Sequence, residues 1–207
     1  MKLRSALPLA RSRCPVIFAT NTPFEGASFS RRNRLARLSW QLVYTLLFRP
    51  TPPPLHAWRR WLLRSFGDRI AAGCHIYSDA RIWAPWNLHM ASQSCLGPRV
   101  ICYSMAPIHL GERVVVSQGA HLCTGSHDYN SASFPLFDKP ITIGADAWIC
   151  TEAFLGPGVQ IGEGAVIGAR AVAMRSQPAW MVCAGNPARP LKPRLHPRGI
   201  HTAASAS

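Results

Sequence analysis

The sequence predicts a mainly β protein, a parallel β-helix of hexapeptide repeats with short helices before it. A small side chain stands four places after each member of an aliphatic series that returns every sixth residue: Ile143, Ile149, Leu155, Ile161 and Ile167, followed by Ala147, Ala153, Val159, Ala165 and Ala171. An α-helix has a period of about 3.6 residues and a strand a period of about 2. A period of six therefore indicates a solenoid in which each hexapeptide forms one face of a coil.

The first segment, residues 1–28, is expected to be a flexible basic extension. It has no unbroken apolar core followed by a small-residue cleavage site, so it is not interpreted as a signal peptide. Residues 1–69 hold 13 of the 23 basic side chains, with Glu25 and Asp68 as their only acids. This charge fits an anionic membrane surface or a solvated tail better than nucleic acid, and no nucleic-acid partner is expected.

Residues 29–69 are predicted to form a basic, amphipathic helical cap. An apolar stretch over residues 35–48 is flanked by arginines and is shorter than the roughly 20 residues that cross a bilayer. Prolines follow it, and a second amphipathic run over residues 56–66 ends at Gly67. The two helices either lie flat in a membrane interface or cover the open end of the solenoid.

Residues 70–177 are predicted to form the β-helix, because hexads also occur upstream in two further phases. Six, three and five hexads give between four and five coils at three hexads per coil. The phase breaks, near residues 105–107 and across 127–140, predict a bulge and an extruded loop. Residues 178–207 are expected to form a C-terminal segment and tail. The upstream hexads are Ile70, Ile76, Ile82, Leu88, Ser94 and Val100, then Leu110, Val116 and Leu122.

Composition fits one globular domain in a reducing compartment. The 207 residues are 48% hydrophobic and 15% charged, enough for a sizeable core. Seven cysteines, without a CxxC pair, stand mostly in the predicted coils and are expected to be small buried side chains. A cytoplasmic protein is expected, with peripheral contact at the inner face of the membrane as an option.

Candidate chemistry lies at the second phase break. His127 is the sixth residue of its hexad, immediately before the loop, where a side chain points away from the core. An unperturbed imidazole with a pKa of about 6.5 suits a general base, although a surface histidine without function is the commoner case. His109 stands eighteen residues earlier in the same phase, and His121 is one face away. Their spacing does not make them converge, so no metal site is expected.

At this point the residues resemble the hexapeptide-repeat O-acetyltransferases over most of the chain. Besides the hexads, the resemblance rests on residues 126–129 (SHDY), 139–149 and 185–189 (GNPAR). Within that family, residues 48–50, 58–67 and 84–88 are similar to acetyltransferases assigned to colanic-acid biosynthesis. The resemblance implies a left-handed β-helix, an exception to right-handed crossovers. It also implies a homotrimer with active sites between subunits, acetyl-CoA as co-substrate, and an acceptor hydroxyl on a sugar or glycan precursor in exopolysaccharide biosynthesis.

The resemblance also implies roles for individual residues. His127 matches the catalytic histidine, and the backbone N–H of Thr151 matches the donor that holds the thioester oxygen. Met174 and Cys150 depart from the family, where many relatives have Thr and Gly. Acceptor candidates by position alone are Trp86, Asn87, Tyr103 and Asp128, of which Asp128 could orient His127, hold a sugar hydroxyl or face solvent. Positions that match contacts to CoA are Trp148, Thr151, Ala169, Arg175, Arg189 and Lys192, the last three near its phosphates.

A non-catalytic protein is the alternative. In that case the solenoid only trimerises, and its basic N-terminus docks on a membrane or on a glycosyltransferase complex. The two hypotheses differ at His127, which the scaffold does not need. Fold alone does not decide between them.

Overall fold

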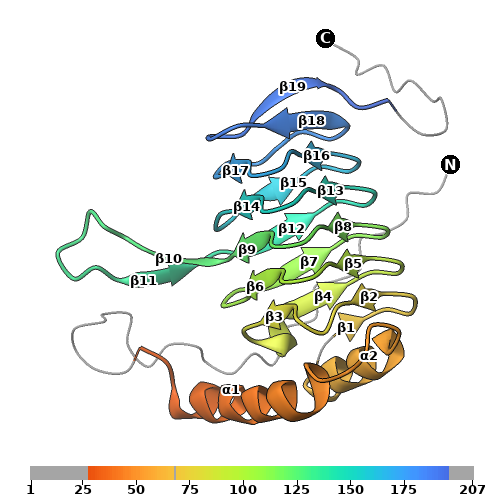
Figure 1. Cartoon of the computed structure of the whole chain (residues 1–207). Helices are drawn as coiled ribbons and strands as arrows, with labels where there is room; N and C mark the ends of the chain where they lie inside the picture. Colours follow the sequence, from red (N-terminus) through yellow and green to blue (C-terminus); the bar gives the residue numbers. More distant parts are fainter. Residues whose placement is uncertain (1–27, 68, 196–207) are drawn as a thin grey trace, which may run out of the picture.

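The chain folds into a left-handed parallel β-helix that stands on two helices, as the computed structural model shows for residues 28–67 and 69–195 (Figure 1). This confirms the predicted fold class. Among those described residues, no helix combines the length and the apolar character needed to cross a bilayer.

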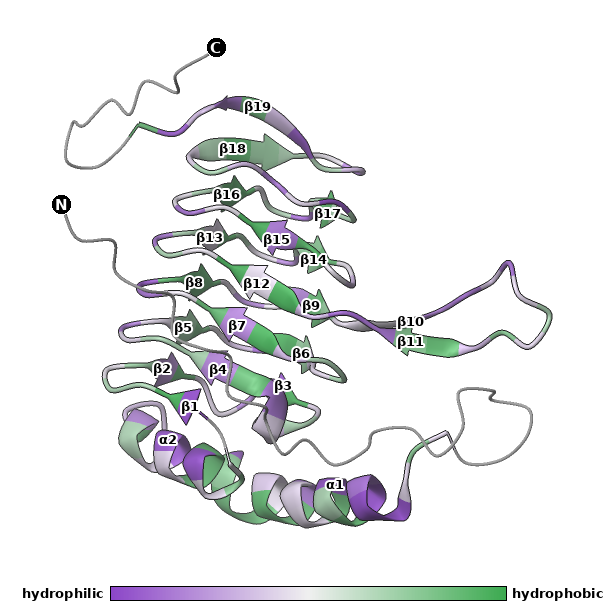
Figure 2. Ribbon diagram, turned by 180° about the vertical axis from the view of Figure 1, so that it is seen from behind, coloured by the Kyte–Doolittle hydropathy of each residue, from purple (hydrophilic) through white to green (hydrophobic). Residues whose placement is uncertain are grey.

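Two helices form the base. Helix α1 (Arg31–Val43) begins at Ser30, whose Oγ accepts the backbone N–H of Asn33 at 3.2 Å. It continues into a π-helical turn, η1 (Tyr44–Phe48), and prolines separate this turn from α2 (His56–Ser65). Apolar and polar residues mix along both helices (Figure 2). Trp40 and Phe48 are buried against the solenoid.

Three parallel sheets form the faces of the solenoid. The first face contains β1 (Arg69–Ile70), β4 (Leu88–Met90), β7 (Ile108–Leu110), β12 (Ile141–Ile143) and β15 (Gln160–Ile161). The second contains β2 (His75–Ile76), β5 (Cys95–Leu96), β8 (Val115–Val116), β13 (Trp148–Ile149), β16 (Val166–Ile167) and β18 (Met181–Ala184). The third contains β3 (Arg81–Ile82), β6 (Ile101–Tyr103), β9 (His121–Cys123), β14 (Phe154–Leu155) and β17 (Val172–Ala173).

The described strands make five complete coils, and β18 begins a sixth, which is two hexads more than the hexad count predicts. The hexads missed by the pattern are β17, where the inward residue is only Ala173, and β18. Hydrogen-bonded register continues through both, because β16 pairs in parallel with β18.

The lower coils are longer than the upper ones. Ile70 lies below Met90, and Met90 below Leu110, so these coils take 20 residues, whereas Ile143 lies below Ile161 in an 18-residue coil. The extra residues fall near the corner between the third and first faces, where the 3₁₀ turn η2 (Pro85–Asn87) lies. The phase break expected near residues 105–107 is present as the shift at β7, but an earlier shift at β4 was missed, so Ser94 and Val100 occupy buried corner positions.

A two-stranded arm leaves the solenoid at this same corner. Strand β10 (Gly125–His127) pairs antiparallel with β11 (Leu136–Asp138). The arm projects sideways from the coils in both views (Figures 1 and 2). Its two ends meet at the solenoid, where the N–H of Lys139 donates to the carbonyl of Thr124 at 2.9 Å. The extruded loop thus lies where the broken hexad period predicts it.

Each end of the solenoid is closed by a different kind of structure. At the top, β19 (Arg189–Pro193) turns back and pairs antiparallel with β18. At the bottom, side chains of the base helices donate to carbonyls of the first coil, which have no strand beneath them. These bonds are Arg64 Nε to Ile70 O (2.8 Å), Arg60 Nη1 to Cys74 O (2.7 Å), Arg59 Nε to Ile76 O (2.6 Å) and Trp40 Nε1 to Ile82 O (2.7 Å).

Candidate active site

His127 is the last residue of β10, at the root of the arm, and is only partly buried. Its ring stacks on the ring of Phe134, with centroids 4.4 Å apart and planes 10° from parallel. Phe134 has a positive φ of 46°, which is unusual for a bulky residue and marks a constrained turn. The arm thus presents the imidazole in a defined orientation.

A hydrogen bond defines which nitrogen of His127 carries the proton. Nδ1 lies 3.0 Å from the carbonyl oxygen of Phe134. Because a carbonyl oxygen only accepts, the neutral ring holds its proton on Nδ1 and leaves the lone pair on Nε2. Nε2 is therefore the nitrogen that can accept a proton from a bound hydroxyl.

Asp128 does not hold the imidazole. Its Oδ1 accepts the backbone N–H of Asn130 at 3.0 Å and so closes a turn within the arm. The group that orients His127 is the backbone carbonyl of Phe134, which sequence reasoning missed. Every residue has a backbone carbonyl, so the residue types in the sequence could not indicate it.

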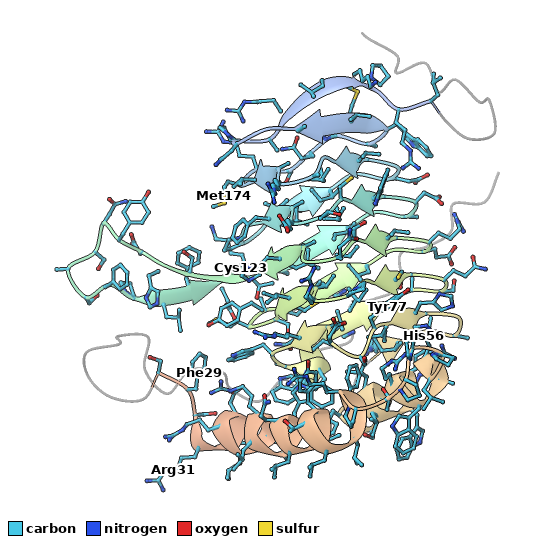
Figure 3. All side chains as sticks on the ribbon, in the orientation of Figure 1. Phe29, Arg31, His56, Tyr77, Cys123 and Met174 are labelled. Carbon is cyan, nitrogen blue, oxygen red and sulfur yellow. The ribbon has the colours of Figure 1, made fainter. Side chains whose placement is uncertain are left out.

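Cys123, four residues before His127, does not carry an activated thiol. Cys123 ends β9 at the root of the arm, with Met174 above it on the same edge (Figure 3). Burial raises the pKa of the Cys123 thiol, and its Sγ donates to the carbonyl of Gly125 at 3.2 Å. A thiol held neutral in this way is a poor nucleophile.

The four acceptor candidates lie along one corner but differ in what they can contact. Asn87 is fully buried, and its Nδ2 donates to the carbonyls of Ser104 and Met105 at 2.9 and 2.7 Å. This corrects its candidacy: Asn87 fastens two coils together and has no surface for a sugar. Trp86 is partly buried, and its Nε1 has no hydrogen-bond partner among the described residues.

Tyr103 is the candidate nearest to the arm. It ends β6, directly below Cys123, and a Cβ on Gly125 would lie 3.1 Å from its Cε1 atom. Burial raises the pKa of the Tyr103 hydroxyl. Its ring meets Trp83 edge-on at 5.5 Å.

Most positions assigned to CoA lie on or beside the second face. Trp148 points outward from β13, 46% exposed, and its Nε1 donates to Ser117 Oγ at 2.9 Å. Thr151 and Ala169 occupy successive turns at the corner between the second and third faces, and the N–H of Arg170 donates to the Thr151 carbonyl at 2.9 Å. The Thr151 N–H itself has no acceptor within the described chain.

The basic positions are divided between two edges. Arg189 and Lys192 lie exposed on β19, above the second face. Arg175 follows β17 and lies at the corner of the third and first faces, two coils above the arm. His127 and Thr151 therefore stand at opposite corners of the third face within one copy of the chain.

The histidines do not form a metal site in the part of the chain that is described. His109 stacks on His89, with ring centroids 4.7 Å apart, and is not in line with His127, because His127 lies in the arm and Thr142 takes the place above His109 on the first face. Burial and then the charges of His109 and Arg69 lower the pKa of His89 to about 4. No group of three His, Cys, Asp or Glu side chains within residues 28–67 and 69–195 could hold a metal ion.

The chain is similar to several proteins of known sequence. The family described as bacterial transferase hexapeptide (six repeats) matches residues 140–172. The chain is 40% identical over 156 residues, 75% of its length and 86% of the relative, to a protein assigned as colanic acid biosynthesis acetyltransferase WcaF in Escherichia coli (strain K12). It is 30% identical over 88 residues, 41% of this chain and 43% of the relative, to the galactoside O-acetyltransferase of the same strain.

Solved structures share the fold. A maltose O-acetyltransferase from Clostridium difficile 630 superposes with a TM-score of 0.72 at 22% identity, over 80% of this chain and 89% of that chain. A hexapeptide-repeat acetyltransferase from Vibrio cholerae, solved with acetyl coenzyme A, gives 0.71 at 23% identity, over 79% and 90%. At these identities the likeness shows the architecture alone.

Proposed function

The chain belongs to the hexapeptide-repeat acetyltransferases, and on that premise we propose that it moves an acetyl group from acetyl-CoA to a hydroxyl of a sugar or glycan precursor. Relatives named as acetyltransferases support the reaction class. A galactoside acetyltransferase among them supports a sugar acceptor, and the colanic acid assignment of the 40% identical relative supports a role in exopolysaccharide biosynthesis.

One observation carries the mechanism: Nδ1 of His127 donates to the Phe134 carbonyl, which leaves Nε2 as a base. Nε2 takes the proton of the acceptor hydroxyl while its oxygen forms a bond to the thioester carbonyl carbon. The carbonyl oxygen becomes negative, and the Thr151 N–H donates to it. When the intermediate collapses, the C–S bond breaks, and the CoA sulfur takes the proton from His127. The products are an acetyl ester and free CoA.

The positions assigned to CoA suit a long, anionic co-substrate. Trp148 offers an exposed aromatic surface on the second face, and Ala169 leaves open backbone in the turn above Thr151. Arg189 and Lys192 add positive charge at the top, where the nucleotide phosphates would bind. Arg175 lies at the other corner, so it would serve this role only from a neighbouring copy.

We also propose that the active unit is a homotrimer. His127 and Thr151 stand at opposite corners of one face, so a reaction that uses both takes each from a different copy. Val115 and Trp148 lie side by side on the second face, 41% and 46% exposed, and form apolar surface for such a contact.

Replacement of His127 tests the mechanism. We expect His127→Ala to lower the release of free CoA thiol by about a hundredfold to ten-thousandfold with a panel of sugar acceptors, while CoA binding and assembly are retained. His75→Ala, which removes an exposed histidine far from the arm, should leave the rate unchanged. Equal rates for wild type and His127→Ala would remove His127 from the mechanism, and the scaffold hypothesis would then stand.

Complementation tests the shared site. Thr151→Pro removes the backbone N–H, so it should be inactive, as His127→Ala should be. If the site joins two copies, co-expression of the two variants restores part of the activity. If both groups act within one copy, the mixture stays inactive.

Finally, we propose that the base contacts an anionic membrane from the cytoplasm. The six described cysteines are free, which fits a reducing compartment. Trp58 and Trp61 in α2 stack at 4.9 Å with Trp61 56% exposed, and arginines at 31, 32 and 34 are exposed at the start of α1, at the other end of the base. The apolar stripe of α1 and η1 has the spacing of one helix face: Leu35, Leu38, Leu42 and Leu46, each 57% to 67% exposed.

Vesicle binding tests this contact. Sedimentation with phosphatidylglycerol vesicles should exceed that with phosphatidylcholine and should fall as salt rises, because part of the attraction is electrostatic. Leu38→Gln with Leu42→Gln should release the protein from the vesicles without a change in CoA binding. Equal sedimentation of the wild type and the double variant would exclude the leucine stripe as the contact.

A further inference from the structure

A cavity of about 710 Å³ lies between the base and the third face. Gln41, Tyr44 and Arg49 form one wall, from α1, η1 and the residue that follows. The other wall comes from the first two coils, at residues 79–83 and 99–103. None of the sequence motifs or CoA positions discussed above accounts for it, except that Tyr103 lines it.

Positive charge dominates this cavity. Three guanidinium groups line it, those of Arg49, Arg81 and Arg99, against one carboxylate, that of Asp79. None of the three guanidinium groups has a hydrogen-bond or ion-pair partner among the described residues. By contrast, Arg113 on the opposite side of the coil binds Asp146 through two hydrogen bonds of 2.7 Å. Three unpaired guanidinium groups around one hollow suit an anion with several oxygens.

The aromatic side of the cavity points toward the arm. Trp83 and Tyr103 form an edge-on pair at the end nearest the corner of the third and first faces. The guanidinium group of Arg37 packs over the ring of Trp83, with its Cζ 4.4 Å from the ring centroid. Tyr103 connects this end of the cavity to the arm: a Cβ on Gly125, two residues before His127 in β10, would lie 3.1 Å from its Cε1 atom.

We propose that this cavity binds the phosphate groups of the acceptor, so that the acceptor is a glycosyl phosphate or diphosphate and not a free sugar. The three guanidinium groups hold the phosphate oxygens, and the sugar passes Trp83 and Tyr103 on its way to Nε2 of His127. Aromatic rings commonly pack on the apolar faces of bound groups while their edges stay polar. The role in acceptor binding rests on the proposed acetyl transfer, but phosphate binding itself can be measured without it.

Binding of inorganic pyrophosphate is the direct test. CoA should be present at saturation, so that its own phosphate site is filled before pyrophosphate is titrated in a calorimeter. We expect the wild type to bind, and Arg81→Gln and Arg99→Gln each to bind about tenfold more weakly, as the loss of a charge-assisted hydrogen bond predicts. Arg113→Gln, which removes a charge from another corner, should bind like the wild type.

Two further measurements keep the test decisive. Arg81→Lys retains the charge and should bind more tightly than Arg81→Gln, and unchanged melting temperatures would show that the variants fold. The proposal is overturned if pyrophosphate does not bind in the presence of CoA, or if the Arg113 variant loses as much affinity as the cavity variants. Each of these results is independent of whether the protein transfers acetyl groups.

The source of the phosphate follows from two probes. UDP-glucose represents a nucleotide sugar, and farnesyl diphosphate represents a lipid carrier. The probe that loses more affinity in Arg81→Gln identifies the source. In turnover assays, the same variant should raise the KM for a phosphorylated acceptor about tenfold with little change in kcat. A kcat loss with unchanged KM would contradict a binding role for the cavity.

Discussion

The two ends of the solenoid pair their exposed backbone groups in different ways. Every coil offers N–H and C=O groups to the next, so the last coil at each end has unpaired backbone groups. At the top, the main chain of β19 pairs with β18. At the bottom, Arg59, Arg60, Arg64 and Trp40 donate to four carbonyls of the first coil.

The two ends therefore place different demands on the amino-acid sequence. A strand closes an end with backbone groups that almost any residue supplies, so the top depends little on side-chain identity. A helix has no spare backbone donors along its side, so the bottom depends on long donor side chains at particular positions. The bottom of the solenoid should therefore lose stability when donor side chains are shortened, and the top should lose stability when side-chain atoms are added.

The largest effect is expected at Arg59. This side chain is fully buried and also donates to Thr51 Oγ at 2.7 Å and to the carbonyls of Pro52 and Pro53. Arg59→Met should lower the free energy of unfolding by about 3 kcal/mol, because several buried acceptors lose their donor at once. Arg64→Met, which removes one bond at a more exposed site, should cost about 1 kcal/mol. Denaturant unfolding measures both, and equal losses would contradict the proposed cap.

At the top, an added methyl group should have the next largest effect. A Cβ on Gly162 would lie 2.6 Å from the Cα of Ala179 in the coil above. Gly162→Ala should therefore lower the free energy of unfolding by about 2 kcal/mol. Leu191→Ser on β19 removes a larger group, but that side chain is 66% exposed, so the change should stay within about 0.5 kcal/mol. A larger loss for Leu191→Ser would show that side chains close the top as well.

The smallest effect expected is a loss of stability in acid that is confined to the lower half. His56 accepts the backbone N–H of Ile76 through Nδ1 at 3.1 Å. Burial, followed by the charges of Arg59, His75 and Arg60, lowers the pKa of His56, against a hydrogen bond to the Ile76 carbonyl that raises it. The unfolded chain, with a histidine pKa of about 6.5, then binds more protons than the folded one, so stability is complete above that pH and falls below it.

Hydrogen exchange can locate this loss. Protection of β1 and β2 should fall relative to β16 and β18 between pH 7.5 and 5.5. His56→Gln keeps an acceptor that does not titrate and should reduce the difference. The pKa of His89, lowered to about 4, adds a loss of the same sign that begins near the same pH and continues down to about pH 4. Equal losses at both ends would contradict a titrating lower cap.

The sequence predicts the fold well because a six-residue period has one structural solution. From Ile143 to Ile167 every aliphatic member of the series is buried. The period fails where the coil is not made of hexads: the 20-residue lower coils bury both Leu88 and Met90, so a count in sixes shifts Ser94 and Val100 into the wrong phase.

The site is less predictable because its key contacts are not properties of single residues. His127 is a candidate because of its place at a broken repeat, but the carbonyl that its Nδ1 contacts belongs to Phe134, seven residues on. Asn87 suits a sugar by type, yet the wide lower corner buries it completely. Arg81 and Arg99 belong to none of the motifs, and only coiling brings them together with Arg49 around one cavity.

The arm that carries His127 leaves and rejoins the coils at one place, where the N–H of Lys139 donates to the carbonyl of Thr124. Between these two residues the arm pairs only with itself among the named strands, so its length and sequence are independent of the hexad register on either side. The arm can therefore be exchanged as a unit. Under the proposed mechanism, an arm grafted from a relative between Thr124 and Lys139, with its own histidine, would change which acceptor reaches the imidazole. The same stack of coils would continue above and below it.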